Sequence, residues 1–421
     1  MSVRRIAIVG AGPVGLELAL RARVEGNDVV VYEAASVGEH FLRYGPARLF
    51  TPFHMNATEL GRSSLRAAGV TLPAEDEILT GAELRERYLL PLARLHELSG
   101  AISEGARVRA IAREGFTKGR SVDGAAGGAR EKRPFLLRIE GTPRLERADV
   151  VIDASGVYAT PNATGPSGLP AIGEESLGAS LEHGLPDVLG EARPRYAGKR
   201  ILLVGDGRSA ANAIADLDEL VRSGGEGGRT RVEWVHRERG GRAFSPVPAA
   251  ELDQLPVLRE PDRRVGRIAR ESAWIQRHQG ATIRSYRALP SGPIEVTLAD
   301  ATGKERLLEV DRVLALVGYR PDLSIFRELQ VHLCYTSEGP MALAAAILSS
   351  QGGDPVSAKG CLDQVSHGPE SLKSPEPGFY VLGAKSYGRN PNFLLALGHQ
   401  QIEDVMTLLG AAEKHLNAAT R

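Results

Sequence analysis

A glycine-rich turn near the N-terminus constrains the fold of this chain more than any other feature of its sequence. Residues 10–15 read Gly-Ala-Gly-Pro-Val-Gly, between an apolar strand pattern at 6–9 and a helical pattern that follows. A second apolar strand occupies 29–32, and Glu33 stands at its end. A surface glycine loop would leave the strands, the helix and the acid unexplained. Their order predicts a βαβ unit that binds a dinucleotide.

The residues of this turn have separate tasks in such a unit. Gly10 permits the tight turn, Gly12 lets a pyrophosphate approach the helix N-terminus, and Gly15 permits close packing of helix on strand. Glu33 is expected to accept hydrogen bonds from ribose hydroxyls. Together with Pro13, these residues form the first candidate cofactor site.

The same pattern recurs in the middle of the chain. Residues 205–210 read Gly-Asp-Gly-Arg-Ser-Ala, between a strand pattern at 200–204 and a helical pattern at 209–221, and a further strand follows at 231–236. We expect Ser209 to cap this helix and to contact phosphate. The candidate cofactor-binding residues of the second turn are Gly205, Gly207, Ser209 and Ala210.

The second unit lacks the terminal acid of the first. At the end of its second strand, residues 236–239 read His-Arg-Glu-Arg, which places Arg237 where the 2′-phosphate of NADPH would lie. This pattern favours NADPH over NADH. The alternative is that Arg237 and Arg239 are solvated and that Glu238 binds the ribose of NADH.

Three further patterns give local expectations. Leucines at helical spacing predict a single amphipathic helix over 83–98. Strand-like runs at 108–111 and 135–139 flank a glycine-rich stretch and predict a β-hairpin with a mobile tip. Near the C-terminus we expect a last strand at 378–382 and a last helix at 392–409.

Composition and charge exclude several classes of partner. Lys+Arg and Asp+Glu both number 52, and the basic residues are scattered, so we expect no nucleic acid partner. The apolar runs are of strand length and no signal-peptide pattern is present, which predicts a cytoplasmic protein without a membrane partner. The only cysteines, Cys334 and Cys361, cannot form a Cys-x-x-Cys pair, and the histidines lack metal-ligand spacing, so no metal is expected.

Four segments carry a resemblance to a known family. They are the second turn at 204–210, the Asp-Ala-Ser-Gly-Val-Tyr run at 153–158, the stretch 38–52 and the Gly-Tyr-Arg-Pro run at 318–321. Together they resemble the flavin-containing monooxygenases and their Baeyer–Villiger relatives, with a more distant similarity to thioredoxin reductase. The resemblance implies FAD and NADPH as cofactors. It also adds flavin-binding candidates, which are Phe41, Arg48, Gly156, Gly383 and Asn392.

The chain also departs from that family in three places. Residues 50–53 read Phe-Thr-Pro-Phe where monooxygenases usually carry an Asn-Thr-Pro-Lys type sequence, and a Phe-x-Gly-x-x-x-His fingerprint ahead of the second turn is absent. Ala384 follows Gly383 where the reductases carry Gly-Asp. The chain therefore lacks an amide, a lysine and a carboxylate that its relatives place near the flavin.

The two turns and the resemblance imply an α/β fold with two Rossmann-like dinucleotide-binding domains, the NADPH domain being inserted into the FAD domain. A chain of 421 residues exceeds one typical core. The expected boundaries are 1–165 for the first part of the FAD-binding domain, 166–310 for the NADPH-binding domain and 311–421 for the second part of the FAD-binding domain. Within the last part, 334–377 is longer than a usual connection and is a candidate cover for the active site.

The resemblance implies an oxidoreductase in which NADPH transfers hydride to FAD and a small nitrogen-, sulfur- or carbonyl-containing substrate is then oxygenated. Hydride transfer needs alignment more than a protein acid or base, so no catalytic side chain is assigned. The alternatives are an NADPH-dependent flavin reductase of a disulfide, quinone or other small acceptor, and a flavin redox sensor without turnover. The expected partner is a small-molecule substrate, and a homodimer is left open.

Overall fold

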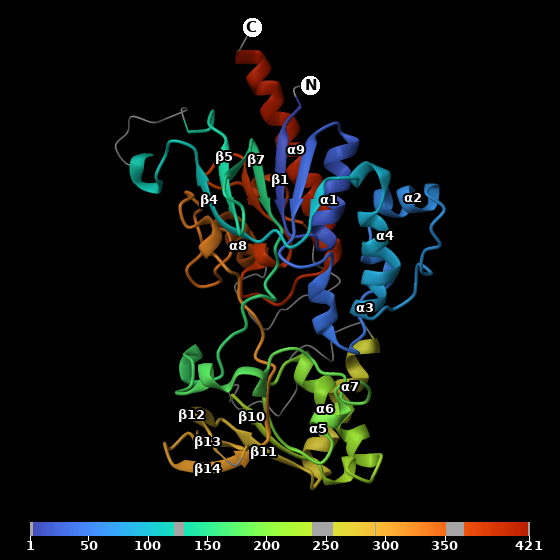
Figure 1. Cartoon of the computed structure of the whole chain (residues 1–421), viewed down its shortest axis with the longest axis vertical. Coiled ribbons are helices and arrows are strands. Elements are labelled where there is room, and N and C mark those ends of the chain that lie inside the picture. Colours follow the sequence, from blue (N-terminus) through green and yellow to red (C-terminus); the bar gives the residue numbers. More distant parts are fainter. Residues whose placement is uncertain (1–2, 122–129, 238–255, 291, 351–365, 420–421) are drawn as a thin grey trace. The chain divides into compact units, whose positions relative to one another are not determined.

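The computed structural model describes residues 3–121, 130–237, 256–290, 292–350 and 366–419. The chain divides into two compact units. Unit 1 comprises Met1–Leu42, Thr51–Thr160 and Arg320–Arg421, and unit 2 comprises Arg43–Phe50 and Pro161–Tyr319. Most of unit 2 is therefore one continuous stretch between two parts of unit 1 (Figure 1).

A parallel sheet of five strands forms the centre of unit 1, in the order β16-β7-β1-β2-β3. Ile6, Ala7 and Ile8 of its middle strand are fully buried, because a parallel strand is covered on both faces. The strands are β1 (Arg5–Val9), β2 (Asp28–Tyr32), β3 (Ile102–Ser103), β7 (Val150–Asp153) and β16 (Phe379–Val381).

Two helices and a small antiparallel sheet complete this core. Helix α1 (Pro13–Val24) joins β1 to β2 and packs against α9 (Leu395–Ala419). Phe135 of the small sheet packs with Ala7 and Val151 of the parallel sheet. The small sheet consists of β4 (Val108–Arg113), β5 (Phe135–Ile139) and β6 (Leu145–Ala148). The antiparallel pairing of β4 with β5 confirms the predicted hairpin, and its tip at 122–129 lies outside the described residues.

The single helix predicted over 83–98 is wrong in its extent. The helical segment begins at Gly81, where Thr80 and Glu83 form a capping box, and it ends before Leu95, whose backbone is not helical. Pro91 has no N–H to donate to the preceding turn, and that turn widens into a π-helical segment. The elements of this region are α2 (Glu59–Ala67), α3 (Gly81–Leu84), the π segment Arg85–Leu89, α4 (Leu90–Ala93) and the 3-10 turn His96–Leu98.

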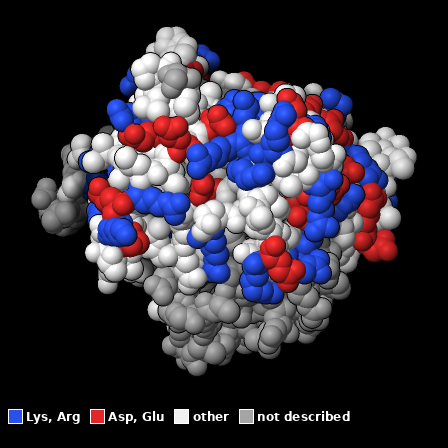
Figure 2. Space-filling view, turned by 90° about the horizontal axis from the view of Figure 1, so that it is seen from below, with Lys and Arg blue, Asp and Glu red and all other residues white. Residues whose placement is uncertain are grey.

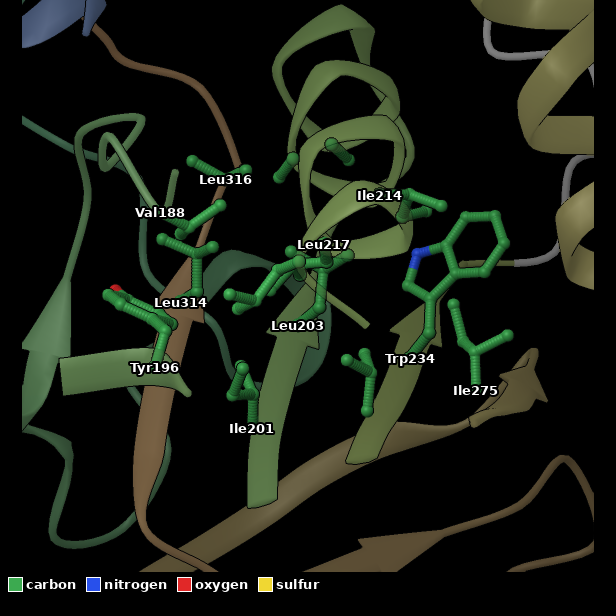
Figure 3. Packing of buried hydrophobic residues seen from close by; sticks show 14 of the residues in the cluster. Val188, Tyr196, Ile201, Leu203, Ile214, Leu217, Trp234, Ile275, Leu314 and Leu316 are labelled. Carbon is green, nitrogen blue, oxygen red and sulfur yellow. The ribbon is translucent and has the colours of Figure 1, made fainter. Parts of the chain in front are cut away.

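Unit 2 has a second parallel sheet, in the order β11-β10-β9-β15-β8. On one face, Leu203 and Trp234 point toward Ile214 and Leu217 of helix α6 (Figure 3). The strands are β8 (Leu181–Glu182), β9 (Arg200–Val204), β10 (Arg231–His236), β11 (Ile275–Gln279) and β15 (Arg312–Ala315), and the helices are α5 (Arg193–Tyr196), α6 (Arg208–Arg222) and α7 (Pro256–Glu271).

The other face of this sheet carries a three-stranded antiparallel sheet. Its residues Ile283, Val296 and Leu308 share a buried cluster with Leu202 and Val235 of the parallel sheet. Its strands are β12 (Thr282–Ala288), β13 (Ile294–Ala299) and β14 (Glu305–Val310). Unit 2 thus has the same three layers as unit 1.

The two units share an equivalent hydrogen bond at the start of the first strand of each parallel sheet. In unit 1 the backbone N–H of Arg5, at the start of β1, donates to Oδ2 of Asp149 at 2.9 Å. In unit 2 the N–H of Arg200, at the start of β9, donates to Oδ2 of Asp311 at 2.7 Å. Both aspartates directly precede the neighbouring strand, β7 or β15. The predicted α/β fold with two Rossmann-like units is confirmed.

The C-terminal elements begin later than the sequence pattern predicts. The last strand is β16, at Phe379–Val381, and α9 begins at Leu395 rather than at Asn392. Oδ1 of Asn390 accepts a hydrogen bond from the N–H of Asn392 at 3.0 Å, so 390–392 forms a turn instead of the first helical turn. Ahead of it, helix α8 (Met341–Ser350) lies in the segment 334–377, of which 351–365 is outside the described residues.

Charge is mixed on the surface, as the composition leads one to expect. Figure 2 shows Lys and Arg side chains interspersed with Asp and Glu on one face of the molecule. Within the described residues, no helix has the length and apolar character needed to cross a membrane. The same residues contain no group of three or more His, Cys, Asp or Glu arranged to hold a metal ion.

Candidate cofactor-binding site

The first glycine turn lies at the carboxyl end of β1, in unit 1. Gly10 has a φ of +102°, and a Cβ there would stand 2.8 Å from the carbonyl oxygen of Ala154. A Cβ on Gly15 would stand 2.0 Å from the carbonyl oxygen of Gly10, so helix α1 packs directly on the turn. Both positions therefore exclude a side chain, which agrees with the tasks inferred from the sequence.

Gly12 differs from these two glycines because no contact within the chain and no backbone angle requires a glycine at this position. Its φ is −82°, which any residue adopts, and a Cβ there would meet no heavy atom within 4 Å. Gly12 is the N-cap of α1, and Pro13 occupies the first helical turn. The open space in front of this helix N-terminus fits a group that needs close approach to the backbone, such as a pyrophosphate.

The N-cap residues of the two glycine-turn helices make no side-chain capping hydrogen bond. Thr58 and Thr80 cap α2 and α3 through their side chains, as ordinary helices require. Gly12 and Gly207, the N-caps of α1 and α6, offer no side chain. The first N–H groups of a helix have no partner within the helix, so these two sites are suited to an anionic ligand.

Glu33 is held beside the first turn. Its Oε2 accepts a hydrogen bond from the N–H of Ala11 at 2.7 Å, and its Oε1 accepts one from the N–H of Ala35 at 2.9 Å. The half-buried carboxylate therefore stands at the end of β2 with a fixed orientation. This is the place from which it would accept hydrogen bonds from ribose hydroxyls.

Of the further candidates, Phe41 and Gly156 lie in unit 1. The segment that precedes Phe41 is tied to the turn, since the N–H of Gly38 donates to the carbonyl oxygen of Ala11 at 3.0 Å. Phe41 itself is buried. Gly156 has a φ of +70° and follows the Ala154–Ser155 backbone against which Gly10 packs. Arg48 is exposed and belongs to unit 2.

Of the C-terminal candidates, Gly383 lies beside Val14, which follows the first glycine turn. The side chain of Val14 would lie 3.5 Å from a Cβ on Gly383 and 2.6 Å from a Cβ on Gly398. The N–H of Gly383 donates to Oε1 of Gln401 at 2.8 Å, which fixes the backbone where it leaves β16. Asn392 is exposed and precedes α9, and its N–H donates to Oδ1 of Asn390.

A buried ion pair at this edge of the sheet was missed by sequence reasoning. Nζ of Lys385 lies 2.6 Å from Oδ2 of Asp153, and the two side chains are 1% and 0% exposed. Lys385 also donates to Oγ of Ser155 at 3.0 Å, and that hydroxyl donates to Oδ1 of Asp153 at 2.7 Å. The pair fixes the backbone on which Gly10 packs. No local pattern in the sequence relates the two residues of this pair.

The segment 51–58 is anchored to α1 by a buried carboxylate. Glu17 accepts hydrogen bonds from the N–H and the hydroxyl of Thr58 at 2.9 Å and 2.6 Å, and from the hydroxyl of Tyr88. Burial raises the pKa of Glu17, although its hydrogen bonds from Thr58 oppose the rise. Earlier in the segment, the side chain of Asn56 is buried and forms hydrogen bonds with Thr51, so it holds the conformation of the loop.

The second glycine turn has the same geometry in unit 2. Gly205 has a φ of +120°, and a Cβ there would stand 2.3 Å from the carbonyl oxygen of Leu316. A Cβ on Gly207 would meet nothing within 4 Å. Ala210 is buried at the third glycine position. The expected cap by Ser209 is wrong: α6 begins at Arg208, so Ser209 is an exposed second helical residue.

The end of β10 shows which residue replaces the acid. In unit 1 the N–H of Gly10 donates to the carbonyl oxygen of Tyr32, and Glu33 is the next residue. In unit 2 the N–H of Gly205 donates to the carbonyl oxygen of Val235 at 3.0 Å, and the next residue is His236. His236 therefore occupies the position of the acid. The exposed Arg237 follows it.

The sequence analysis placed Arg237 at this position because an apolar pattern does not fix the end of a strand to a single residue. Glu33 lies 18 residues after Gly15, whereas His236 lies 26 residues after Ala210. Spacing from the glycine turn therefore does not identify His236, whereas the hydrogen bond from the N–H of Gly205 to the carbonyl oxygen of Val235 does.

Cys334 lies in a turn of unit 1, and Cys361 lies outside the described residues. The N–H of Cys334 donates to the carbonyl oxygen of Gly339 at 2.8 Å. Hydrogen bonds from Ser337 lower the pKa of its thiol. No second cysteine lies beside it among the residues that the structure describes.

Comparison with known proteins gives a result only at the level of structure. The sequence matches no protein-family model and no curated protein. Among solved structures, a bacillithiol disulfide reductase from Bacillus cereus has a TM-score of 0.68 at 16% identity, with 98% of this chain and 100% of that chain covered. The thioredoxin reductase of T. acidophilum has a TM-score of 0.59 at 18% identity, with 97% and 99% covered.

A third similar structure belongs to a hydroxylase. The ornithine N-hydroxylase of Kutzneria sp. 744, solved with reduced FAD, NADP+ and L-ornithine, has a TM-score of 0.62 at 14% identity, with 98% and 100% covered. The chain has the two-domain FAD/NAD(P)-binding fold. The resemblance inferred from the sequence is confirmed for this fold, which disulfide reductases and a flavin-dependent hydroxylase share.

Proposed function

We propose that the chain is an oxidoreductase that binds FAD at the first glycine turn and NADPH at the second. The observation that carries the proposal is the pair of uncapped helix N-termini, each with an open glycine at the N-cap. Glu33 supplies a ribose acceptor beside the first turn. At the second, His236 and Arg237 stand where an acid would select NADH, and a guanidinium beside a 2′-phosphate selects NADPH.

Hydride transfer from NADPH to FAD is the chemistry that these cofactors supply. The residues of the chain bind and orient the cofactors, because this step depends on alignment rather than on a protein acid or base. The cofactor-binding set is therefore the candidate set of the two turns together with Phe41, Arg48, Gly156, Gly383 and Asn392. Glu33, Gly10 and Gly205 have the best-defined geometry within it.

Two candidate activities differ in what accepts the electrons of the reduced flavin. Oxygenation of a small nitrogen-, sulfur- or carbonyl-containing substrate is the first, and it is supported by the resemblance to the monooxygenases and by the similarity to the ornithine N-hydroxylase. Direct reduction of a small disulfide or quinone is the second, and it is supported by the similarity to the bacillithiol disulfide reductase. A Cys-x-x-Cys relay is not available for either activity, because the sequence contains only Cys334 and Cys361.

Stopped-flow absorbance tests this proposal in two steps. Under anaerobic conditions NADPH should bleach the flavin at least about tenfold faster than NADH at equal concentration, which is the gain from one charge-assisted hydrogen bond to the 2′-phosphate. A flavin spectrum that NADPH leaves unchanged would contradict the proposal. Oxygen is then admitted. A delayed return of the oxidised spectrum through a distinct transient species supports oxygenation, and an immediate return supports the reductase.

A further inference from the structure

The segment 43–50 belongs to unit 2, although the residues on either side of it belong to unit 1. The N–H of Leu185 donates to the carbonyl oxygen of Arg43 at 3.3 Å. Gly45 has a φ of +57°, and a Cβ there would stand 2.1 Å from the carbonyl oxygen of Leu185, so this approach requires glycine. Ala47 packs on the buried cluster to which helix α6 contributes. The segment is therefore held against the same core as α6.

The last residue of this segment, Phe50, contacts the start of α6. The guanidinium carbon of Arg208 lies over the ring of Phe50, 4.9 Å from its centre, which is a cation–π distance. Arg208 is the first residue of α6 and directly follows Gly207, the N-cap. Both side chains of the contact are half-buried. Phe50 therefore contacts a side chain at the helix N-terminus to which we assign the phosphates of NADPH.

Arginine is an unfavourable residue at the first position of a helix. The helix macrodipole places partial positive charge at the N-terminus, so a cation there is repelled. The first turn of α6 contains no acidic residue. In unit 1 the same position holds Pro13, which is suited to the start of a helix. The second site thus carries a positive charge that the first site lacks, and an anionic ligand would offset the repulsion.

The contact with Phe50 restricts the side chain of Arg208. An arginine has many rotamers, and restricting them before a ligand arrives lowers the entropic cost of binding. The five N–H donors of a guanidinium lie in its plane, so a ring against its face leaves them able to donate to a phosphate. Arg208 can therefore bind a phosphate while others of its donors contact the protein.

We propose that Phe50 is a positioning residue of the NADPH site, and that it holds Arg208 in place to bind the pyrophosphate of the dinucleotide. The inference rests on the proposed function, and it adds to the second site a segment that lies far from the second glycine turn in the sequence. NADPH and NADH share the pyrophosphate. Arg208 therefore strengthens the binding of both dinucleotides and does not select between them.

Titration of the full-length, FAD-loaded protein with NADP+ and NAD+ tests this inference. Both probes contain the pyrophosphate, and only NADP+ carries the 2′-phosphate. Arg208→Gln should weaken the binding of both probes by the same factor, about tenfold or more, because a charge-assisted hydrogen bond is lost. Phe50→Leu should weaken both by about threefold. Phe50→Tyr keeps the ring and should bind both probes as tightly as the wild type.

A double variant shows whether Phe50 acts through Arg208. If it does, Phe50→Leu/Arg208→Gln should bind NADP+ no more weakly than Arg208→Gln alone. An equal loss from Phe50→Leu in both backgrounds would overturn the inference. An Arg208→Gln protein that bound both probes as tightly as the wild type would overturn it as well.

Arg222→Gln is the matched control for the arginine. Arg222 lies at the other end of α6, where its exposed side chain pairs with Asp218 at 2.9 Å, so its replacement should leave both affinities unchanged. Thermal unfolding of each variant checks that unit 2 is folded. A loss for NADP+ alone in Arg208→Gln would assign Arg208 to the 2′-phosphate and contradict the inference. A wild-type protein that binds neither dinucleotide would instead remove the NADPH part of the proposed function, and this inference with it.

Discussion

Gly12→Ala should reduce the affinity for FAD by about 100-fold, the equivalent of losing roughly 3 kcal/mol of charge-assisted hydrogen bonding to the pyrophosphate. The added Cβ would meet no protein atom within 4 Å, so it would occupy the space in front of the helix N-terminus and nothing else. The backbone at Gly12 has a φ of −82°, which alanine adopts without strain. The stability of the apoprotein to urea should therefore fall by no more than about 1 kcal/mol, the cost of alanine at an N-cap.

Gly207→Ala is the matched change in the second unit. A Cβ there also meets no atom within 4 Å, and the φ of −84° is equally permissive. This variant should retain FAD and should raise the Kd for NADPH about 100-fold, for the same physical reason. Titration of each apoprotein with FAD, and of each FAD-loaded protein with NADPH, separates the two effects. Two variants that bound both cofactors as tightly as the wild type would contradict the assignment of either turn.

Lys385→Met should destabilise unit 1 by about 3–5 kcal/mol, because it leaves the Asp153 carboxylate buried without its partner. The two side chains are 1% and 0% exposed, and their atoms lie 2.6 Å apart. Lys373→Met is the control, since Lys373 forms an exposed pair with Glu370, and such a pair contributes about 1 kcal/mol or less. Urea unfolding of the apoproteins measures both changes.

A second variant shows whether the pairing, rather than the volume of the lysine, is responsible. In Asp153→Leu/Lys385→Met both charges are removed together, and apolar replacement of a buried pair is often neutral. The double variant should therefore recover most of the stability that Lys385→Met loses. A loss of less than about 1 kcal/mol for Lys385→Met alone would show that the charge of Asp153 does not need this partner.

The fold could be predicted because its decisive signals are local. A strand, a glycine turn and a helix occupy adjacent residues, and Gly10 and Gly205 have the positive φ that such a turn demands. The hairpin of β4 and β5 was predictable for the same reason, since alternation is visible within each strand. These patterns appear twice in the chain, which is why two Rossmann-like units could be inferred from the sequence.

The errors arose where one residue changes the local geometry. Leucine spacing at 83–98 continues past Pro91, but the missing N–H of that proline prevents a regular helix. Ser209 has the chemistry of a helix cap, but the turn places Gly207 at the cap and Ser209 inside the helix. Asn392 was assigned to the start of the last helix, where a hydrogen bond from its N–H to the side-chain oxygen of Asn390 forms a turn instead.

The remaining site residues depend on contacts between distant parts of the chain. Asp153 and Lys385 belong to neighbouring strand ends of one sheet, and no local pattern relates them. Phe50 contacts Arg208 although the two residues are far apart in the sequence. The residue at the acid position of unit 2 was identified by the hydrogen bond from the N–H of Gly205 to the carbonyl oxygen of Val235, which makes His236 the next residue.

The measurement that tests the account most directly is the absorbance spectrum of the purified chain before and after incubation with FAD, followed by identification of the chromophore released on denaturation. The two turns predict a yellow protein that retains one equivalent of FAD and that NADPH bleaches in the absence of oxygen. A protein that is colourless after gentle purification, and that takes up no FAD when it is supplied, would contradict the assignment of the first turn and with it the proposed function.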